Sequence, residues 1–399
     1  MTVSRQGTHL NPLTPPDINP VTAAGGAVPL FAKRNVTHVT QPMMPPLAEY
    51  IPYLETIWEN RWLTNSGPFH EQLEGALAEY LEVPHISLVS NGTTALWLAL
   101  LASRVSGEVI TTPFSFVATA HALRLIGATP VFVDIDPETC NLDPSQVEAA
   151  ITDRTTAILP VHCYGFPCDL DALEAIAEAH DLKLLYDAAH AFAVREQGRS
   201  VLARGDMSVL SFHATKVFNT FEGGAIVSAN RAAKQRIDRL RNFGFIEDTI
   251  LPTVGLNGKM NELQAAFGLL QLRYVDGAIA RRAQIAARYR EALSAFPGIT
   301  LFPVSESSTP NHSYFPIRVA EPCPGGRDGL WRRLEAAGIL ARRYFHPLIC
   351  DMSGYRHLPS AQAPLPVARR MAGEVLCLPL HPGLSEAEID RTIDIVRSG

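Results

Sequence analysis

The sequence has few cysteines, and their spacing follows no known pattern. The six cysteines among its 399 residues form no CxxC pair. Cys163 and Cys168 lie close together, but no second pair of cysteines or histidines completes a zinc site. We therefore predict free thiols, no metal site and a cytoplasmic location, where thiols stay reduced.

Excess charge of one sign and long hydrophobic runs are also lacking. The formal net charge of −6 gives no electrostatic reason to bind nucleic acid or an anionic membrane. No apolar run approaches the roughly 18 residues of a transmembrane helix. Residues 1–20 are polar and rich in proline and threonine, unlike a secretory signal. The sequence therefore predicts neither a nucleic-acid nor a membrane partner.

Two glycine-rich nucleotide-binding motifs are missing as well. The segment Ser90-Asn91-Gly92-Thr93-Thr94 has too few glycines for a dinucleotide fingerprint, and no lysine follows it as in a P-loop. A nicotinamide-dependent oxidoreductase is therefore a poor fit, because its ribose-binding acid is also absent from the expected place.

The sequence does contain a regular alternation of short apolar runs and amphipathic stretches. Such alternation predicts an α/β fold, with a parallel sheet covered on both faces. We expect a mobile N-terminal arm at 1–25, a large domain at 26–275 and a small C-terminal domain at 276–399. Strands are predicted at 86–90, 109–113, 130–135, 157–162, 182–187, 208–212 and 225–228, and helices at 45–60, 71–82, 94–103, 117–126, 144–151, 170–180, 261–294 and 328–337.

A lysine and an aspartate follow two different strands of this predicted sheet. Lys216 comes shortly after the strand at 208–212, and Asp187 ends the strand at 182–187. Open α/β sheets bind ligands at the carboxyl ends of their strands, so we expect both side chains there. Pyridoxal 5′-phosphate (PLP) needs a lysine for its aldehyde and a carboxylate for its pyridine nitrogen. The pair predicts a PLP enzyme with Lys216 and Asp187 as its catalytic residues, although a surface lysine and a helix N-cap are the structural alternatives.

Other residues of these turns suit the remaining parts of PLP. Thr93 and Thr94 open a helix whose free N–H groups attract phosphate, and Ser211 offers a hydroxyl to the same phosphate. Phe116 is placed to stack on the pyridine ring, with core packing as the alternative. His190 follows Asp187 by three residues and can hydrogen-bond to the cofactor's ring oxygen or to that carboxylate.

Taken together, these motifs resemble the DegT/DnrJ family of sugar aminotransferases, from about Val28 to the C-terminal end. The family implies PLP fold type I (aspartate aminotransferase-like), with a mostly parallel seven-stranded sheet in the large domain and a smaller α/β domain. It also implies Lys216 as the Schiff-base lysine, and a homodimer in which Asn257 reaches the phosphate of the neighbouring subunit. Family members often carry glutamine at the position of His190. The resemblance rests on residues 91–96, 127–134, 160–165, 187–191, 211–216 and 255–262.

Within the family, the sequence is most similar to one branch. Residues 61–68, 111–116, 213–224 and 342–348 carry this similarity. The branch moves an amino group from glutamate to C4 of dTDP-4-keto-6-deoxy-D-glucose, giving the 4-amino-4,6-dideoxy sugar used in O-antigens of lipopolysaccharide and related glycans. Candidate contacts to this nucleotide sugar are Asn65, Gly67, Arg241, Lys259, Tyr344 and His346.

Three alternatives use the same fold. A PLP-dependent sugar dehydrase carries histidine in place of the Schiff-base lysine, so Lys216 argues against it. An aminotransferase for another keto-sugar or a keto-cyclitol shares every catalytic residue and stays open. A non-catalytic regulator would have no need for Lys216 and Asp187.

Overall fold

The computed structural model describes residues 36–246, 249–250 and 254–398. The predicted N-terminal arm at 1–25 lies outside these residues. From Thr37 onward the described chain forms one compact unit. Among its helices, none combines the length and apolar character that a membrane span requires.

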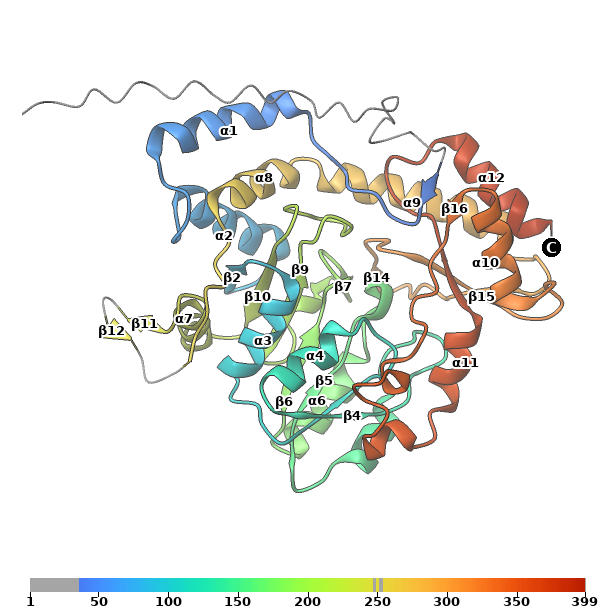
Figure 1. Cartoon of the computed structure of the whole chain (residues 1–399), viewed down its shortest axis with the longest axis horizontal. Helices are drawn as coiled ribbons and strands as arrows, with labels where there is room; N and C mark the ends of the chain where they lie inside the picture. Colours follow the sequence, from blue (N-terminus) through green and yellow to red (C-terminus); the bar gives the residue numbers. More distant parts are fainter. Residues whose placement is uncertain (1–35, 247–248, 251–253, 399) are drawn as a thin grey trace, which may run out of the picture. The chain divides into compact units, whose positions relative to one another are not determined.

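The centre of this unit is a seven-stranded sheet, which confirms the predicted fold class (Figure 1). Its strand order is β2-β10-β9-β6-β5-β3-β4. All pairs from β9 to β4 are parallel, whereas β10 runs antiparallel to both β9 and β2. The strands are β2 (Ile86–Val89), β3 (Glu108–Thr111), β4 (Thr129–Phe132), β5 (Thr155–Leu159), β6 (Lys183–Asp187), β9 (Met207–Ser211) and β10 (Gly224–Ser228).

Helices connect the strands and surround the sheet. Six of the eight predicted helices are present with slightly different ends. The helix predicted at 144–151 is the short α5 followed by a 3-10 helix at Glu148–Ala150, and the one predicted at 261–294 is two helices with a break at Arg273–Tyr274. The helices are α1 (Leu47–Asn60), α2 (Pro68–Leu81), α3 (Gly92–Ala102), α4 (Ala118–Leu125), α5 (Pro144–Val147), α6 (Leu170–Ala179), α7 (Arg231–Leu240), α8 (Glu262–Leu272), α9 (Val275–Leu293), α10 (Gly326–Ala336), α11 (Pro366–Glu374) and α12 (Glu386–Arg397). Of these, α7, α11 and α12 were not predicted.

Both faces of the sheet are buried, because successive strand residues point to opposite sides. Leu184 packs in a cluster with residues of α2, α6 and α8. Its neighbour Leu185 packs in another cluster with residues of α3, α4 and α7. The two layers of helices exclude water from the strands and leave the strand ends open for a site.

The C-terminal part adds a smaller sheet of order β13-β15-β17, all antiparallel. Its own buried cluster includes residues of α9, α10 and α12, which Figure 1 shows beside β15. The boundary at 275/276 stays a prediction. The remaining strands are β1 (Thr37–His38), β7 (Arg195–Glu196), β8 (Arg199–Ser200), β11 (Phe245–Ile246), β12 (Thr249–Ile250), β13 (Ile299–Leu301), β14 (Ser308–Thr309), β15 (Phe315–Val319), β16 (Ile339–Leu340) and β17 (Val375–Leu378).

Candidate active site

A cavity of about 720 Å³ opens at the carboxyl ends of β6 and β9, beside the start of α3. A cavity of this size is ample for a cofactor and part of a substrate. It brings together the two predicted catalytic residues, the predicted phosphate and ring contacts of this chain, and one predicted substrate contact. These are Lys216, Asp187, Thr93, Thr94, Ser211, Phe116, His190 and Tyr344.

Lys216 lies in the loop that follows β9, where its backbone N–H donates to the carbonyl of His213. Burial lowers the pKa of its amine from 10.5 to about 8, and the negative charge of Asp187 acts in the opposite direction. Withdrawal from water disfavours a charged ammonium, and this explains the sign of the change. A sizeable fraction of the amine is therefore neutral, and thus nucleophilic, near neutral pH.

Asp187 is the last residue of β6 and is 5% exposed. Its Oδ2 accepts a hydrogen bond from the Thr119 hydroxyl at 2.7 Å, and its Oδ1 accepts one from the backbone N–H of Ala189 at 3.1 Å. Burial raises the pKa of this carboxyl, while the two hydrogen bonds and the charge of Lys216 lower it. The carboxylate is held in one orientation and keeps lone pairs available for a ligand in the cavity.

His190 is fixed in one tautomer by the backbone. Its Nδ1 accepts the N–H of Tyr164 at 3.2 Å, so the proton of the neutral ring is on Nε2. Burial, together with the positive charge of Lys216, holds its pKa well below the usual value. The ring lies parallel to Phe345 and meets the edge of Tyr314. His190 is therefore a neutral N–H donor at the cavity.

The start of α3, with Ser211 beside it, is a candidate phosphate cradle. Asn91 is the N-cap, and its side chain accepts the N–H of Thr94, which leaves the preceding N–H groups without an intrahelical partner. A Cβ on Gly92 would approach the Cβ of Ser211 to 2.8 Å and its Oγ to 3.1 Å. The helix start and the hydroxyl of Ser211 can approach this closely only because residue 92 is glycine. The site fits each part of PLP. Hydroxyls and free N–H groups suit its phosphate, the buried amine suits its aldehyde, and the buried carboxylate suits its pyridine nitrogen.

Phe116 is 62% exposed while also lining the cavity, so it is not a core residue in this chain. On another side, Tyr314, Tyr344 and Phe345 form an aromatic wall. An exposed phenylalanine at the cavity is free to cover the face of a bound ring, which stays a prediction.

Five predicted substrate contacts do not line this cavity. Arg241 is buried, and its guanidinium is bonded to Glu74 and Asp238. Lys259 donates to the side chain of Asn242 and lies over the ring of Phe243. Asn65, Gly67 and His346 also do not line the cavity of their own chain, and neither does the predicted cofactor contact Asn257.

The structure shows why residue 67 is glycine. A Cβ there would meet the carboxylate carbon of Glu262 at 2.5 Å. Glu262 accepts the N–H groups of Phe69 and His70 at 2.9 Å each and so caps α2. Gly67 therefore allows the segment 61–68 to pack closely against Glu262 at the end of the segment 255–262.

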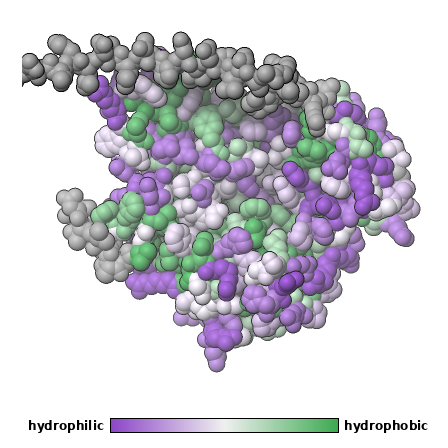
Figure 2. Space-filling model, viewed as in Figure 1, coloured by the Kyte–Doolittle hydropathy of each residue, from purple (hydrophilic) through white to green (hydrophobic). Residues whose placement is uncertain are grey.

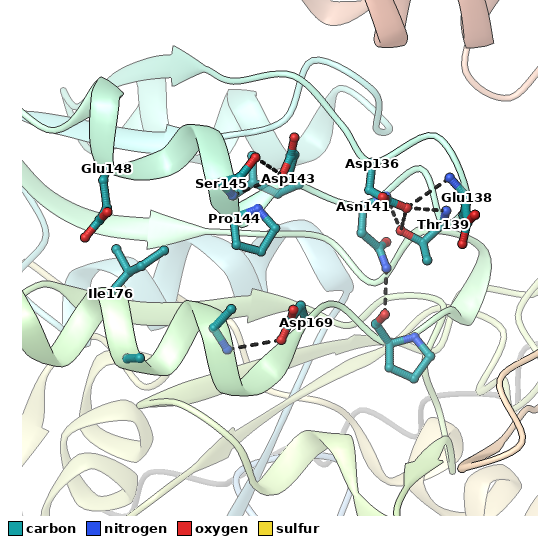
Figure 3. A pocket seen from close by; sticks show the side chains of 14 residues that line it. Asp136, Glu138, Thr139, Asn141, Asp143, Pro144, Ser145, Glu148, Asp169 and Ile176 are labelled. Carbon is teal, nitrogen blue, oxygen red and sulfur yellow. Dashed lines mark hydrogen bonds between the residues drawn. The ribbon is translucent and has the colours of Figure 1, made fainter.

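A second cavity, of about 740 Å³, lies between the segment 136–148 and the start of α6, and it is lined with carboxylates (Figure 3). Asp136 accepts the N–H groups of Glu138 and Thr139, and Asp143 accepts that of Ser145. These acids stabilise turns and a helix start and carry no sign of a reactive group. The first cavity is therefore the candidate active site.

Sequence reasoning missed two side chains that support this site. Thr119 bonds to Asp187, and Ser115 bonds to Thr119. Their only signal in the sequence is a pair of hydroxyl residues four positions apart, after a predicted strand.

The chain matches the DegT/DnrJ/EryC1/StrS aminotransferase family over residues 47–397. A dTDP-4-amino-4,6-dideoxy-D-glucose transaminase of Shigella dysenteriae is 52% identical over 359 residues, which are 90% of this chain and 98% of that protein.

Two solved structures are similar as well. DesI, determined in the presence of its TDP-sugar product, has a TM-score of 0.87 and 39% identity, covering 92% of this chain and 93% of that one. NtdA from Bacillus subtilis, with bound cofactor PMP, has a TM-score of 0.80 and 30% identity, covering 88% and 81%.

Proposed function

The chain belongs to the DegT/DnrJ/EryC1/StrS aminotransferase family, and from this we propose that it moves an amino group from glutamate to C4 of dTDP-4-keto-6-deoxy-D-glucose. The product would be dTDP-4-amino-4,6-dideoxy-D-glucose. The protein is a PLP-dependent sugar aminotransferase. The choice of this sugar is supported by the 52% identity to a transaminase named for this product.

One structural observation carries the chemistry: the buried amine of Lys216 and the buried carboxylate of Asp187 face the same cavity. When bound, PLP supplies an aldehyde that bonds to amines and a ring that withdraws electrons from that bond. Lys216 is the amine that holds this aldehyde between turnovers. Once displaced by the amino donor, Lys216 moves a proton between the donor's Cα and the cofactor's C4′.

The pKa of about 8 suits Lys216 to this proton transfer. A base works best when its pKa lies near the working pH, because it must both take and return the proton. Burial is the cause that lowers the pKa of this amine. The same amine acts in both half-reactions.

Asp187 and His190 are the residues that would hold the two polar edges of the ring. The carboxylate of Asp187 would keep the pyridine nitrogen protonated, and the Nε2–H of His190 would donate to the ring oxygen. Both residues are fixed by backbone N–H groups, those of Ala189 and Tyr164. Fixed partners are what orients the reacting carbon toward Lys216.

Several features support a homodimer with shared active sites. The cavity in the described chain is lined by no arginine, although a phosphate, a nucleotide diphosphate and glutamate all bring negative charge. Asn257 is exposed and does not line the cavity of its own chain, so it is accessible to a second subunit. Large apolar side chains are also exposed, and Figure 2 shows hydrophobic residues over α1 among hydrophilic ones. Those on α1 and the following loop are Leu47, Ile51, Trp58, Trp62 and Leu63.

We also propose that the reaction takes place in the cytoplasm. All six cysteines are buried and unpaired, as expected of a chain kept in a reducing compartment.

Replacement of Lys216 tests the chemistry. Lys216→Ala should abolish turnover and the visible absorbance of cofactor joined to the protein, with unchanged circular dichroism. The matched control is Lys183→Ala, because Lys183 is an exposed lysine on β6 and lies outside the cavity. Multiple turnovers by the Lys216 variant would contradict the assignment.

A substrate panel tests the sugar. The pyridoxamine form of the protein is mixed with 4-keto and 3-keto sugars on dTDP, UDP and GDP, and the products are identified by mass and NMR. We expect amination at C4 of the dTDP-4-keto sugar, with 2-oxoglutarate formed when glutamate restores the cycle. An amine at C3, or activity confined to another nucleotide, would refute the proposed substrate.

A further inference from the structure

Two buried hydroxyls link the cavity wall to the carboxylate of Asp187. Ser115 is 4% exposed, and Thr119, on the first turn of α4, is 1% exposed. The Ser115 and Thr119 oxygens are 2.9 Å apart, and the Thr119 oxygen is 2.7 Å from Oδ2 of Asp187. The three groups form a continuous chain of hydrogen bonds.

The direction of this chain follows from counting protons. An ionised carboxylate only accepts, so Thr119 must donate its single hydroxyl proton to Asp187. The bond between Ser115 and Thr119 can then be made only with Ser115 as donor. Polarisation along such a chain strengthens the bond that reaches the carboxylate.

We propose that Thr119, supported by Ser115, is a positioning residue that keeps Asp187 ionised and aimed at the pyridine nitrogen of the cofactor. This inference rests on the proposed role of Asp187. Burial favours the neutral carboxylic acid, and a proton kept by Asp187 is a proton taken from the ring nitrogen. The Thr119 hydroxyl opposes this transfer because its hydrogen bond stabilises the charged carboxylate more than the neutral acid.

A packing role alone predicts something different. Threonine and valine have nearly the same shape, so Thr119→Val removes the hydrogen bond and little else. If Thr119 only filled space, the proton between Asp187 and the ring would not move. The location of that proton therefore distinguishes a positioning role of Thr119 from a packing role.

The experiment measures this proton directly, without turnover. Wild-type protein and variants are loaded with PLP labelled with ¹⁵N in the ring, whose chemical shift distinguishes a protonated from a neutral pyridine nitrogen. For Thr119→Val we expect the ratio of protonated to neutral ring to fall about tenfold near pH 7, the effect of one lost bond to a charged group. Thr119→Ser, which restores a hydroxyl, should stay near wild type.

Two further variants complete the set. Ser115→Ala should shift the ratio in the same direction but less, and it decides the matter if Thr119→Val does not fold. Thr111→Val is the matched control, because the Thr111 hydroxyl is equally buried but donates to the carbonyl of Leu159. It should leave the ¹⁵N signal unchanged.

The outcomes separate this inference from the proposed function. An unmoved signal in Thr119→Val, with a shifted one in Asp187→Asn, overturns the role of Thr119 and leaves that of Asp187 intact. An unmoved signal in Asp187→Asn overturns the proposed role of Asp187 itself. A shift in Thr111→Val equal to that in Thr119→Val shows a general packing effect and also refutes the inference.

Discussion

The amine of Lys216 should react with free PLP far more readily at neutral pH than an ordinary lysine does. Only the neutral amine attacks an aldehyde, so the rate of attachment follows the fraction of Lys216 that has lost its proton. Burial lowers the pKa of this amine from 10.5 to about 8. The rate should therefore rise about tenfold per pH unit below 8 and level off above it.

The size of the effect follows from these two pKa values. At pH 7, a pKa of about 8 leaves roughly one amine in ten neutral, against roughly one in three thousand for an unperturbed lysine. The folded site thus supplies a gain of about 300-fold in reactive amine. Asp187→Asn removes the negative charge that raises the pKa of Lys216, so its plateau should begin at a lower pH than in the wild type.

Stopped-flow absorbance of protein stripped of cofactor and mixed with PLP measures these rates from pH 6 to 10. The rate with Nα-acetyl-lysine, expressed per neutral amine, corrects for titration of PLP itself. A corrected rate that still rises tenfold per unit above pH 9 would refute the reasoning, because it would show an amine with its ordinary pKa. A plateau in Asp187→Asn at a higher pH than in the wild type would show that the sign assigned to Asp187 is wrong.

Three further predictions follow from particular contacts. Glu262→Gln should lower the free energy of unfolding by about 2–4 kcal/mol, because two N–H groups at the start of α2 lose a charged acceptor; a urea midpoint equal to the wild type's would contradict this. Gly92→Ala should weaken PLP binding about tenfold or more by forcing Ser211 away from α3, and an unchanged dissociation constant in fluorescence titration would count against the phosphate cradle. His162 is buried and neutral, with a pKa lowered to about 3; its contribution to stability is complete above pH 6.5 and is lost below it by about 1.4 kcal/mol per pH unit, since only the unfolded chain takes up the proton. His162→Gln should flatten that acid slope, and equal slopes in denaturant titrations would disprove this.

The sheet and the two catalytic side chains could be predicted from local sequence. Continuous apolar runs identify strands buried on both faces, and Lys216 and Asp187 follow two of them. The partners of other charged side chains could not be predicted in this way. The local sequence of Arg241 suggests a free cation, yet its guanidinium is bonded to Glu74, which lies 167 residues earlier in the chain. Only the folded chain shows that this cation already has a partner.

The three helices α7, α11 and α12 were not predicted, for different reasons. In α7, the buried residues Ile237 and Leu240 lie three positions apart on one face, and Asn230 caps its start, so its signals were present in the sequence. Likewise, α12 begins with a capping box of Ser385 and Glu388, which was present in the sequence as a Ser-x-x-Glu signal. The start of α11 depends on Asp134 at the end of β4, more than 200 residues away, which no local pattern reveals.

Three acids in the motifs shared with the family have different roles, and the groups that each carboxylate contacts explain why. Asp134 accepts three backbone N–H groups, two of them at the start of α11. Glu262 accepts two N–H groups at the start of α2 and is enclosed there. Asp187 accepts one N–H and one hydroxyl and lines the cavity, so its remaining lone pairs are available to a ligand there.

Membership of a shared motif does not distinguish these acids, and sequence analysis selects Asp187 because it ends a buried strand and accompanies Lys216. In the structure they differ in whether the carboxylate can still accept a hydrogen bond from a ligand. A carboxylate saturated by helix N–H groups gains little from a ligand, whereas Asp187 is buried, polarised by Thr119 and still open toward Lys216. Conversion of Asp134 or Glu262 to its amide should therefore change stability much more than the protonation of a bound pyridine ring, and Asp187→Asn should do the reverse.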